Sequence, residues 1–262
     1  MIRALYTAAS GMSAQQMNLD TIANNLANSA TTGFRQTRLQ FQDMVYQNLV
    51  TPGAAQSQST VGAGLQIGLG TRPAATEVIM TQGSLNQTSN PLDVAIEGSG
   101  FFQVQRPDGT IAYTRAGQFH MNNQGTIVTT EGDPVIPTIT IPPNATSVTI
   151  TPYGVVNATL AGQQNPSQLG QLQLATFPNP GGLESMGANL LQATLSSGDA
   201  VLGNPGGTEG LGTLEQGYLE NSNVDVVTQF VQMVLAQRAY ESNSKVIKAA
   251  DDMYSQVNNM AR

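Results

Sequence analysis

The sequence contains no cysteine and no tryptophan, and it has a single histidine, His120. Without cysteine the chain can form no disulfide framework and offers no thiol chemistry, so its folding is indifferent to the redox state of its compartment. A Cys/His metal cluster is also excluded, and a histidine-based catalytic triad has His120 as its one candidate. His120 lies at the end of a predicted strand, and we interpret it as a surface or packed side chain. We therefore predict no metal site.

Charged residues are scarce as well. They make up 10% of the chain, whereas an ordinary soluble domain carries about 25%. Seventeen acidic and ten basic residues give a net charge of −7, and the basic residues are scattered singly, so the composition argues against nucleic acid as a partner. Few charges also lower the ionic cost of burying surface against a neighbouring molecule. A neutral globular protein would share this composition.

Long apolar runs are missing. No stretch of about 18 apolar residues occurs, so we expect no membrane insertion. The first residues, Met1 to Thr7, lack the apolar segment of a secretory signal. The sequence thus predicts a chain that stays in the cytosol or leaves it by a route that reads no cleavable signal.

Glycine is abundant but does not form a recognisable cofactor or nucleophile motif. The glycines between Gly62 and Gly70 miss the dinucleotide-binding spacing and do not open a helix. Gly98-Ser99-Gly100 lacks the outer spacing of a nucleophile elbow. We predict no cofactor and no catalytic residues, so the sequence gives little support to an enzyme.

A heptad pattern marks the N-terminal segment. Leucine or methionine recurs every seven residues, and Ile22 lies on the same stripe, which predicts a helix from Ile2 to Asn28 with a coiled-coil-like seam. Gly33 can adopt the left-handed conformation that ends such a segment. The predicted seam residues are Leu5, Met12, Leu19, Ile22 and Leu26.

A second helix is predicted at the C-terminus. Residues 224–260 contain neither glycine nor proline, and Asn223 and Asp225 offer N-cap chemistry. At 1.5 Å per residue this helix would be roughly 50 Å long. Apolar residues follow spacings of three and four, so we predict that they extend the same assembly interface. These residues are Val227, Val231, Val234, Val246, Met253, Val257 and Met260. The alternative is that both helices pack on their own central domain.

The centre of the chain has a different pattern. Short apolar runs between turn signals such as Pro107-Asp108-Gly109-Thr110 and Asn122-Asn123-Gln124-Gly125 predict a β-barrel or sandwich-like domain. The fold class is α+β, with long N- and C-terminal helices forming a coiled-coil-like domain, an extended connector and a central all-β domain. The predicted boundaries are 1–34 and 222–262 for the helical assembly domain, 35–75 and 196–221 for the connector, and 76–195 for the β-rich domain.

Three motifs in order along the chain resemble those of bacterial flagellar rod and hook proteins. The first runs from Ile22 to Asn28 and continues in Thr32-Gly33-Phe34-Arg35. The second is Asp93-Val94-Ala95-Ile96 with Gly98, Gly100 and Phe101-Phe102, and the third is Gln237-Arg238-Ala239-Tyr240-Glu241-Ser242-Asn243-Ser244-Lys245. The connector around Gly64 to Pro73 is most similar to distal-rod members of the family. The resemblance implies that Leu65, Ile67 and Arg72 are the functional residues of the connector.

The resemblance implies a structural role in the flagellar basal body. It implies export as an unfolded chain through the flagellar type III apparatus, followed by self-assembly into a hollow helical shaft that crosses the periplasm and transmits torque. The implied partners are copies of the chain, neighbouring rod and hook proteins, surrounding ring proteins of the outer envelope and the export apparatus. The alternatives are a proximal-rod or hook subunit or, from a different class, a β-rich binding module or hydrolase clasped by its helices.

Overall fold

The computed structural model describes residues 2–50, 55–56, 59–60, 64–162, 165–207 and 210–260. The chain divides into two compact units. The first, called the helical unit below, contains Met1–Ala27, Thr37–Glu77 and Asp225–Arg262. The second, called the β-rich unit, contains Asn28–Gln36 and Val78–Val224.

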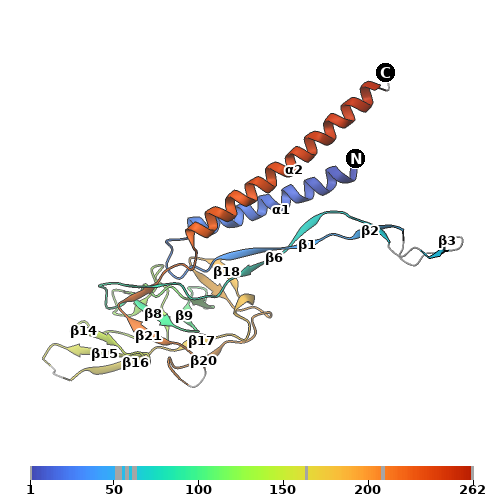
Figure 1. Ribbon diagram of the computed structural model, residues 1–262. Coiled ribbons are helices and arrows are strands. Elements are labelled where there is room, and N and C mark those ends of the chain that lie inside the picture. Colours follow the sequence, from blue (N-terminus) through green and yellow to red (C-terminus); the bar gives the residue numbers. More distant parts are fainter. Residues whose placement is uncertain are drawn as a thin grey trace. The chain divides into compact units, whose positions relative to one another are not determined.

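Two long helices dominate the helical unit. They are α1 (Ile2–Ala27) and α2 (Val226–Met260), whose bounds lie within two residues of those expected from the sequence. Asp225 caps α2: its Oδ1 accepts a hydrogen bond from the Val227 amide at 3.1 Å, and its Oδ2 accepts one from Thr228 Oγ1 at 2.6 Å. The capping role predicted for Asp225 is confirmed. The helices run antiparallel side by side, so both chain ends lie at the same end of the pair (Figure 1). No helix in the described part of the chain has the length and apolar character needed to cross a membrane.

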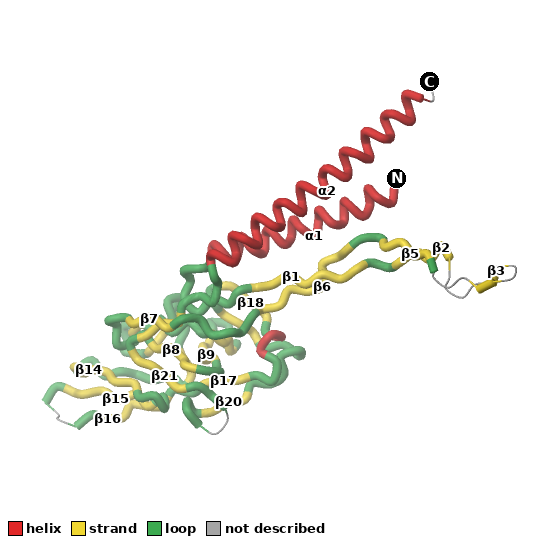
Figure 2. The backbone as a smooth tube through the Cα atoms, in the orientation of Figure 1, coloured by secondary structure: helices red, strands yellow, loops and turns green. Residues whose placement is uncertain are grey.

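A long two-stranded arm completes the helical unit (Figure 2). Strand β1 (Thr37–Asp43) pairs with β6 (Thr71–Val78), and β2 (Tyr46–Val50) pairs antiparallel with β5 (Leu65–Gly68). The short strands β3 (Ala55–Gln56) and β4 (Ser59–Thr60) pair with each other. This arm covers most of residues 35–75, where we predicted an extended connector, and its role as a connector stays a prediction.

The β-rich unit holds the remaining strands. They are β7 (Leu85–Gln87), β8 (Val94–Glu97), β9 (Phe101–Gln105), β10 (Ile111–Thr114), β11 (His120–Met121), β12 (Ile127–Val128), β13 (Val135–Ile136), β14 (Ala145–Ile150), β15 (Val155–Leu160), β16 (Ser167–Gln171), β17 (Leu174–Thr176), β18 (Glu184–Gly187), β19 (Leu190–Gln192), β20 (Val201–Gly203), β21 (Thr213–Gln216) and β22 (Tyr218–Glu220). A 3-10 turn, η1 (Pro180–Gly182), precedes β18.

The largest sheet has seven strands in the order β18-β19-β10-β9-β17-β20, with β13 also paired to β9. A separate three-stranded sheet is formed by β14, β15 and β16. Both turns singled out from the sequence are confirmed, because residues 107–110 join the antiparallel strands β9 and β10 and residues 122–125 join β11 and β12. His120 is exposed on β11.

The apolar core lies inside the β-rich unit. Phe102 and Phe119 meet edge to face with ring centroids 5.0 Å apart, surrounded by buried valine, leucine and isoleucine side chains. A second cluster is built around Phe101, Tyr113 and Phe177. Alternation along β9 explains both clusters, since neighbouring residues of a strand point to opposite faces of the sheet.

The prediction for the second half of the connector is wrong. Residues 196–221 are not part of the arm: β20 pairs with β17, β21 with β8, and β22 with β7, all inside the β-rich unit. The glycine-rich sequence suggested a linker, but Leu211 and Leu214 are buried in the core, and Leu214 pairs with Ile96. At Gly212 a side chain would collide with the Glu97 carbonyl, so glycine permits close strand contact here rather than flexibility.

Candidate assembly surface

Small residues form the contact between α1 and α2. The buried residues of these helices include Ala8 and Ala14 on α1 and Ala236 and Ala250 on α2. At Gly11 an added Cβ would come within 2.8 Å of the amide nitrogen of the Asn243 side chain, so a larger residue there would require that side chain to move. Small side chains allow close backbone approach but bury little apolar area, so this contact by itself contributes modestly to stability.

A polar cluster secures the end of the helix pair near the arm. Asn25 is almost fully buried, and its amide donates to the Thr37 carbonyl at 2.8 Å while its Oδ1 accepts from the Thr37 amide at 2.9 Å. Its Nδ2 also lies 3.5 Å from Gln229 Oε1 on α2. One side chain thus joins α1, β1 and α2, which fixes the start of the arm against the helices.

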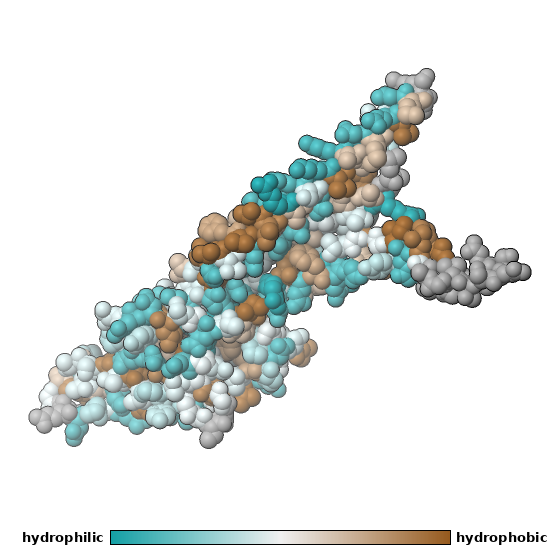
Figure 3. All heavy atoms as spheres, viewed as in Figure 1, coloured by the Kyte–Doolittle hydropathy of each residue, from teal (hydrophilic) through white to brown (hydrophobic). Residues whose placement is uncertain are grey.

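The larger apolar residues of α2 face solvent. Val227 is 72% exposed, and Val231, Val234, Leu235 and Phe230 are each at least half exposed. Their spacing of three, four, seven and eight residues places them on one face, which we call the α2 stripe. Gln229 and Ala236, which are buried, lie on the opposite face. Figure 3 shows the stripe as a patch of hydrophobic residues over the first half of α2. Such a contiguous exposed apolar patch is typical of an interaction surface.

The predicted interface residues fall into two groups in the structure. On α1, Ile22 is buried and Leu5, Met12, Leu19 and Leu26 are half-buried. On α2 all of the predicted interface residues are exposed, including Val246, Met253, Val257 and Met260 nearer the C-terminus. Within this unit the predicted α1 residues are largely engaged, whereas the predicted α2 residues remain available. Their role in assembly stays a prediction.

Two residues of the stripe were missed in the sequence. Phe230 and Leu235 lie three and four residues from Val227 and Val231, so the helical spacing could have identified them. The predicted seam contains only the valines of this segment. The structure shows a wider apolar face.

The arm carries a second set of exposed apolar side chains. Val45, Leu49 and Leu65 are all exposed around the β2–β5 ladder, and this group is called the arm patch below. It forms the hydrophobic region beside the end of the arm in Figure 3. Of the other predicted connector residues, Ile67 is half-buried and Arg72 is exposed.

Polar contacts hold the arm in its extended form. Glu77 on β6 accepts hydrogen bonds from Arg38 Nη2 at 2.8 Å and Gln40 Nε2 at 2.7 Å on β1. The hydrogen bond from Arg38 is the main reason why the pKa of the Glu77 carboxyl lies below its ordinary value, and the bond from Gln40 lowers this pKa further. At Gly70, where φ is 114°, a side chain would collide with Ser10 Oγ, and that hydroxyl accepts from the Thr71 amide at 3.4 Å. The arm therefore packs directly on α1.

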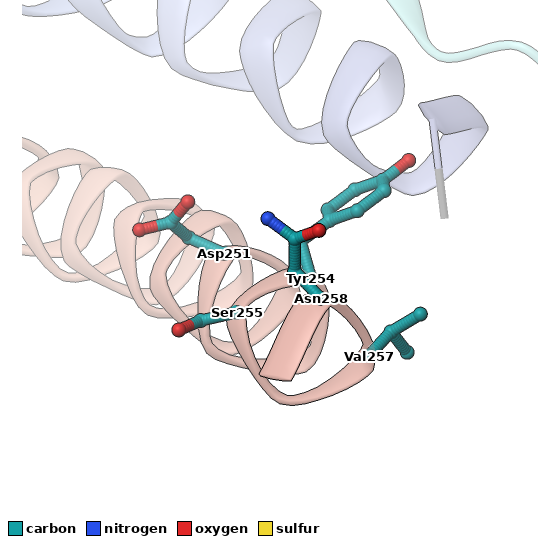
Figure 4. A pocket seen from close by; sticks show the side chains of 5 residues that line it. All are labelled: Asp251, Tyr254, Ser255, Val257 and Asn258. Carbon is teal, nitrogen blue, oxygen red and sulfur yellow. The ribbon is translucent and has the colours of Figure 1, made fainter. Parts of the chain in front are cut away.

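An open hollow near the C-terminal end of α2 has no catalytic arrangement. It is lined by Asp251, Tyr254, Ser255, Val257 and Asn258, all exposed. Figure 4 shows Tyr254 directed toward α1 and Val257 pointing away from it, so the side chains do not converge. No group of three or more histidine, cysteine or acidic residues that could hold a metal ion occurs among the residues described.

Comparison with known proteins gives matches along nearly the whole chain. Residues 5–35 match the family described as flagella basal body rod protein, residues 95–158 the flagellar hook protein FlgE/F/G D1 domain, and residues 215–260 the flagellar basal body rod FlgEFG protein C-terminal domain. The first and third motifs that suggested the resemblance lie within these segments, and the second overlaps the match that begins at residue 95.

Full-length relatives carry the same description. The flagellar basal-body rod protein FlgG of Buchnera aphidicola (from Acyrthosiphon pisum) is 48% identical over 99% of this chain and 100% of its own length. The proteins of that name from Borreliella burgdorferi and Bacillus subtilis are 46% and 40% identical, each over 100% of both chains. A solved structure of the Helicobacter pylori flagellar hook protein FlgE2 is 13% identical, covers 71% of this chain and 43% of its own, and has a TM-score of 0.25, which carries no argument about the fold.

Proposed function

Because the chain belongs to the flagellar basal-body rod and hook family, we propose that it is a structural subunit of the distal rod of the bacterial flagellum. In this role, copies of the chain assemble into a hollow helical shaft in the basal body that transmits torque from the motor to the hook. The proposal assigns the chain a mechanical rather than a catalytic role. Its neighbours in the envelope are other rod and hook proteins and the surrounding rings, and the chain reaches them through the flagellar export apparatus.

The α2 stripe is the observation that carries the self-assembly part of this proposal. Val231 and Leu235 are 56% and 64% exposed on a helix whose opposite face is already packed on α1. An exposed apolar face of this size gains free energy when a second molecule covers it. If the covering surface is a different patch of the next copy, the contact does not close on itself and an open helical assembly results.

The chemistry of the surface suits repeated contacts between copies. With only 10% charged residues, neighbouring copies can approach without leaving many charges desolvated and unpaired. The arm patch offers a second apolar contact from a separate part of the helical unit. We assign the α2 stripe to assembly and the arm patch, with Ile67 and Arg72, to the stiffness of the shaft.

Electron microscopy of the purified full-length chain tests self-assembly directly. We expect helical shafts from the wild type and none from Val231→Asp, because the substitution places a charge in the α2 stripe. Gln232→Asp adds the same charge at an exposed polar position of α2 outside the stripe and should assemble normally. Far-UV circular dichroism should show unchanged secondary structure in both variants. Normal shafts from Val231→Asp would remove the α2 stripe from the interface.

The predicted seam residues and the position in the flagellum are tested separately. Leu19→Asp and Val257→Asp are also expected to block shaft formation while leaving the β-rich unit folded. Labelling of isolated basal bodies with an antibody to the chain should mark the part of the rod nearest the hook. Label on the hook itself or on the proximal rod would contradict the distal assignment.

A further inference from the structure

Charged residues are unevenly distributed along the β-rich unit. Residues 134–208 contain only two, Glu184 and Asp199, and both are acidic. By contrast, residues 92–133 contain seven, which are Asp93, Glu97, Arg106, Asp108, Arg115, Glu131 and Asp133. Residues 134–208 are called the charge-poor segment below, and they include the β14–β16 sheet and strands β17 to β20.

This distribution affects where two β-rich units can touch. Ten acidic and three basic residues give the unit a net charge of −7, which is that of the whole chain. Two of the three basic residues, Arg35 and Arg115, lie in a buried ion cluster with Glu220. Two copies of such a unit repel each other where their acidic surfaces meet. A contact between them is therefore favoured where the surface carries little charge.

The charge-poor segment exposes apolar side chains at the edge of the largest sheet. Leu195, Val201 and Leu202, called the β20 patch below, are three of the seven large apolar residues exposed in the described part of this unit. Leu195 is fully exposed. Val201 and Leu202 are neighbours on a strand and point to opposite faces of the sheet, yet they are 46% and 49% exposed. Neither face of β20 is therefore covered.

Hydrogen bonds hold the β20 patch in a defined conformation. In the turn before β20, the Ser196 carbonyl accepts a hydrogen bond from Asn179 Nδ2 at 2.9 Å. On β20 itself, Val201 pairs with Thr176 of β17. The turn and the strand are thus both attached to residues 176–179. A surface that is ordered before binding loses little conformational entropy when a partner covers it.

The outer edge of β20 is free as well. This strand is the last in the seven-stranded sheet and pairs with β17 alone among the described strands (Figure 1). Edge strands expose unpaired backbone donors and acceptors, and natural proteins commonly protect them with charged side chains. No residue of β20 is charged. Its edge is therefore open to hydrogen-bonding groups of another molecule.

The outer face of the β14–β16 sheet carries groups that match such an edge. Thr149, Asn157 and Gln168 lie in register across its three strands. Val148 and Val156, on the opposite face, pack with the core. Hydroxyl and amide side chains provide both donors and acceptors. These three strands contain no charged residue.

A glutamine already pairs with a strand edge inside this chain. Gln216 Nε2 donates to the Val148 carbonyl at 2.9 Å, and its Oε1 accepts a hydrogen bond from the Ile150 amide at 3.0 Å. This side chain occupies the edge of β14 in place of a further strand. Amide side chains of a neighbouring copy can satisfy the edge of β20 in the same way.

We propose that the β20 patch of one copy docks on the outer face of the β14–β16 sheet of a second copy. The inference rests on the proposed function, because it adds a contact between the β-rich units of neighbouring copies to the contact assigned to the α2 stripe. Burial of the three apolar side chains stabilises this contact, and few charges are desolvated on either side. The two surfaces differ, so the contact does not close on itself and repeats from copy to copy.

Cross-linking tests this contact directly, because the chain contains no cysteine of its own. Shafts are assembled from an equal mixture of Leu202→Cys and Thr149→Cys copies that differ in mass, and a short bifunctional maleimide is added. We expect dimers that contain one copy of each kind. In the control, Gln124→Cys replaces Thr149→Cys at an exposed position in the turn between β11 and β12, and few mixed dimers should form.

Two results of this experiment would overturn the proposal. The first is a yield of mixed dimers with Thr149→Cys that does not exceed the yield with Gln124→Cys. The second is cross-linking of Leu202→Cys copies to one another in shafts that contain no other variant. That result would show that the β20 patch meets itself in a closed contact.

Charged substitutions provide a second measurement. Leu202→Asp should raise the critical concentration for shaft assembly about tenfold, in line with the loss of one apolar side chain from the contact. Adding Thr149→Lys to the same chain should lower it again, because each aspartate then meets a lysine of the next copy. Gln124→Lys is the matched control and should not lower it. Equal effects of the two lysines would contradict the docking site on the β14–β16 sheet.

Failure of the proposed function can be told apart from failure of this contact. Shafts that form without mixed dimers leave the distal-rod proposal standing and show that the contact is wrong. A wild type that forms no shafts contradicts the proposed function, and the same cross-linking is then carried out on the concentrated full-length chain in solution. Mixed dimers there support the contact, and their absence overturns it.

Discussion

Asn25 and Thr37 exchange two hydrogen bonds that connect the end of α1 to the start of the arm. The Asn25 amide donates to the Thr37 carbonyl at 2.8 Å, and the Thr37 amide donates back to Asn25 Oδ1 at 2.9 Å. A side-chain amide can satisfy both backbone groups of one residue because it carries a donor and an acceptor. This pair defines where β1 begins relative to the helices.

Replacing Asn25 with alanine should loosen this connection. Both hydrogen bonds would be lost in a site that is 3% exposed, and we expect a cost of about 2 kcal/mol in the free energy of unfolding. Urea unfolding followed by circular dichroism would measure it, and hydrogen exchange should show faster opening at the start of β1. Gln16→Ala, at an exposed position of the same helix, should change stability by less than about 0.5 kcal/mol. Equal effects of the two substitutions would contradict a specific role for Asn25.

Glu220 is a buried polar side chain that we expect to stabilise the β-rich unit, as Asn25 stabilises the helical unit. Glu220→Gln preserves volume but leaves Arg35 and Arg115 buried without a counter-charge, and it weakens the bond that Glu220 Oε1 accepts from the Gly83 amide at 2.8 Å. Breaking a buried ion pair in this way typically costs about 3–5 kcal/mol. Thermal unfolding should show a large decrease in midpoint for this variant. Glu97→Gln, at an exposed position on β8, is the matched control, and a similar midpoint for both would show that the cluster contributes little.

The two terminal helices could be predicted from sequence because their signals are local. Both segments lack proline and carry a repeating apolar spacing, and the C-terminal one also lacks glycine and begins at the Asp225 cap. The turns at 107–110 and 122–125 were predictable for the same reason, since the residue types that favour a turn are neighbours in the chain.

Pairings between distant segments could not be predicted in this way. Arg35 and Glu220 are separated by 185 positions, and no periodicity links them. The strands within residues 201–220 carry no local signal of their pairing, because their partners β17, β8 and β7 lie far earlier in the chain. Strand β10 ends at Thr114, and the next residue, Arg115, forms a buried ion pair with Glu220, a partner that no local pattern announces. The α2 stripe is wider than the predicted valine repeat, because Phe230 and Leu235 lie on the same face.

The cap of α2 should respond to acid. Hydrogen bonds from Thr228 Oγ1 and the Val227 amide hold the pKa of Asp225 below its ordinary value of 3.8. Because the folded-state pKa is lowered, the stabilising effect is fully present above pH 3.8 and is lost as the pH falls through the lowered pKa. The Val227 amide signal in NMR should therefore titrate with a midpoint below 3.8.

The substitution Asp225→Asn distinguishes the effect of the carboxylate charge from that of the capping hydrogen bond. Asparagine retains the Oδ1 acceptor and still caps the helix, but it does not titrate. The Val227 amide signal of this variant should lose the acid transition while the helix keeps its start. A midpoint at or above 3.8 in the wild type, or an unchanged transition in the asparagine variant, would show that another group is responsible.

The arm patch should control how readily an assembled shaft bends. Val45, Leu49 and Leu65 are exposed on an arm that polar contacts already hold extended, so their apolar surface is available to a neighbouring copy. Replacing all three with threonine keeps a residue type that favours strands but removes most of the apolar contact. We expect shafts to form, because assembly is assigned to the terminal helices, and we expect these shafts to bend more easily than those of the wild type.

The measurement is the persistence length of shafts traced in electron micrographs. The matched control places threonine at three exposed polar positions of the same ladder, Gln47, Asn48 and Gln66. This control should leave the persistence length unchanged. If the two triple variants are equally stiff, the arm patch does not stiffen the shaft; if the apolar variant forms no shafts at all, the arm belongs to the assembly interface itself.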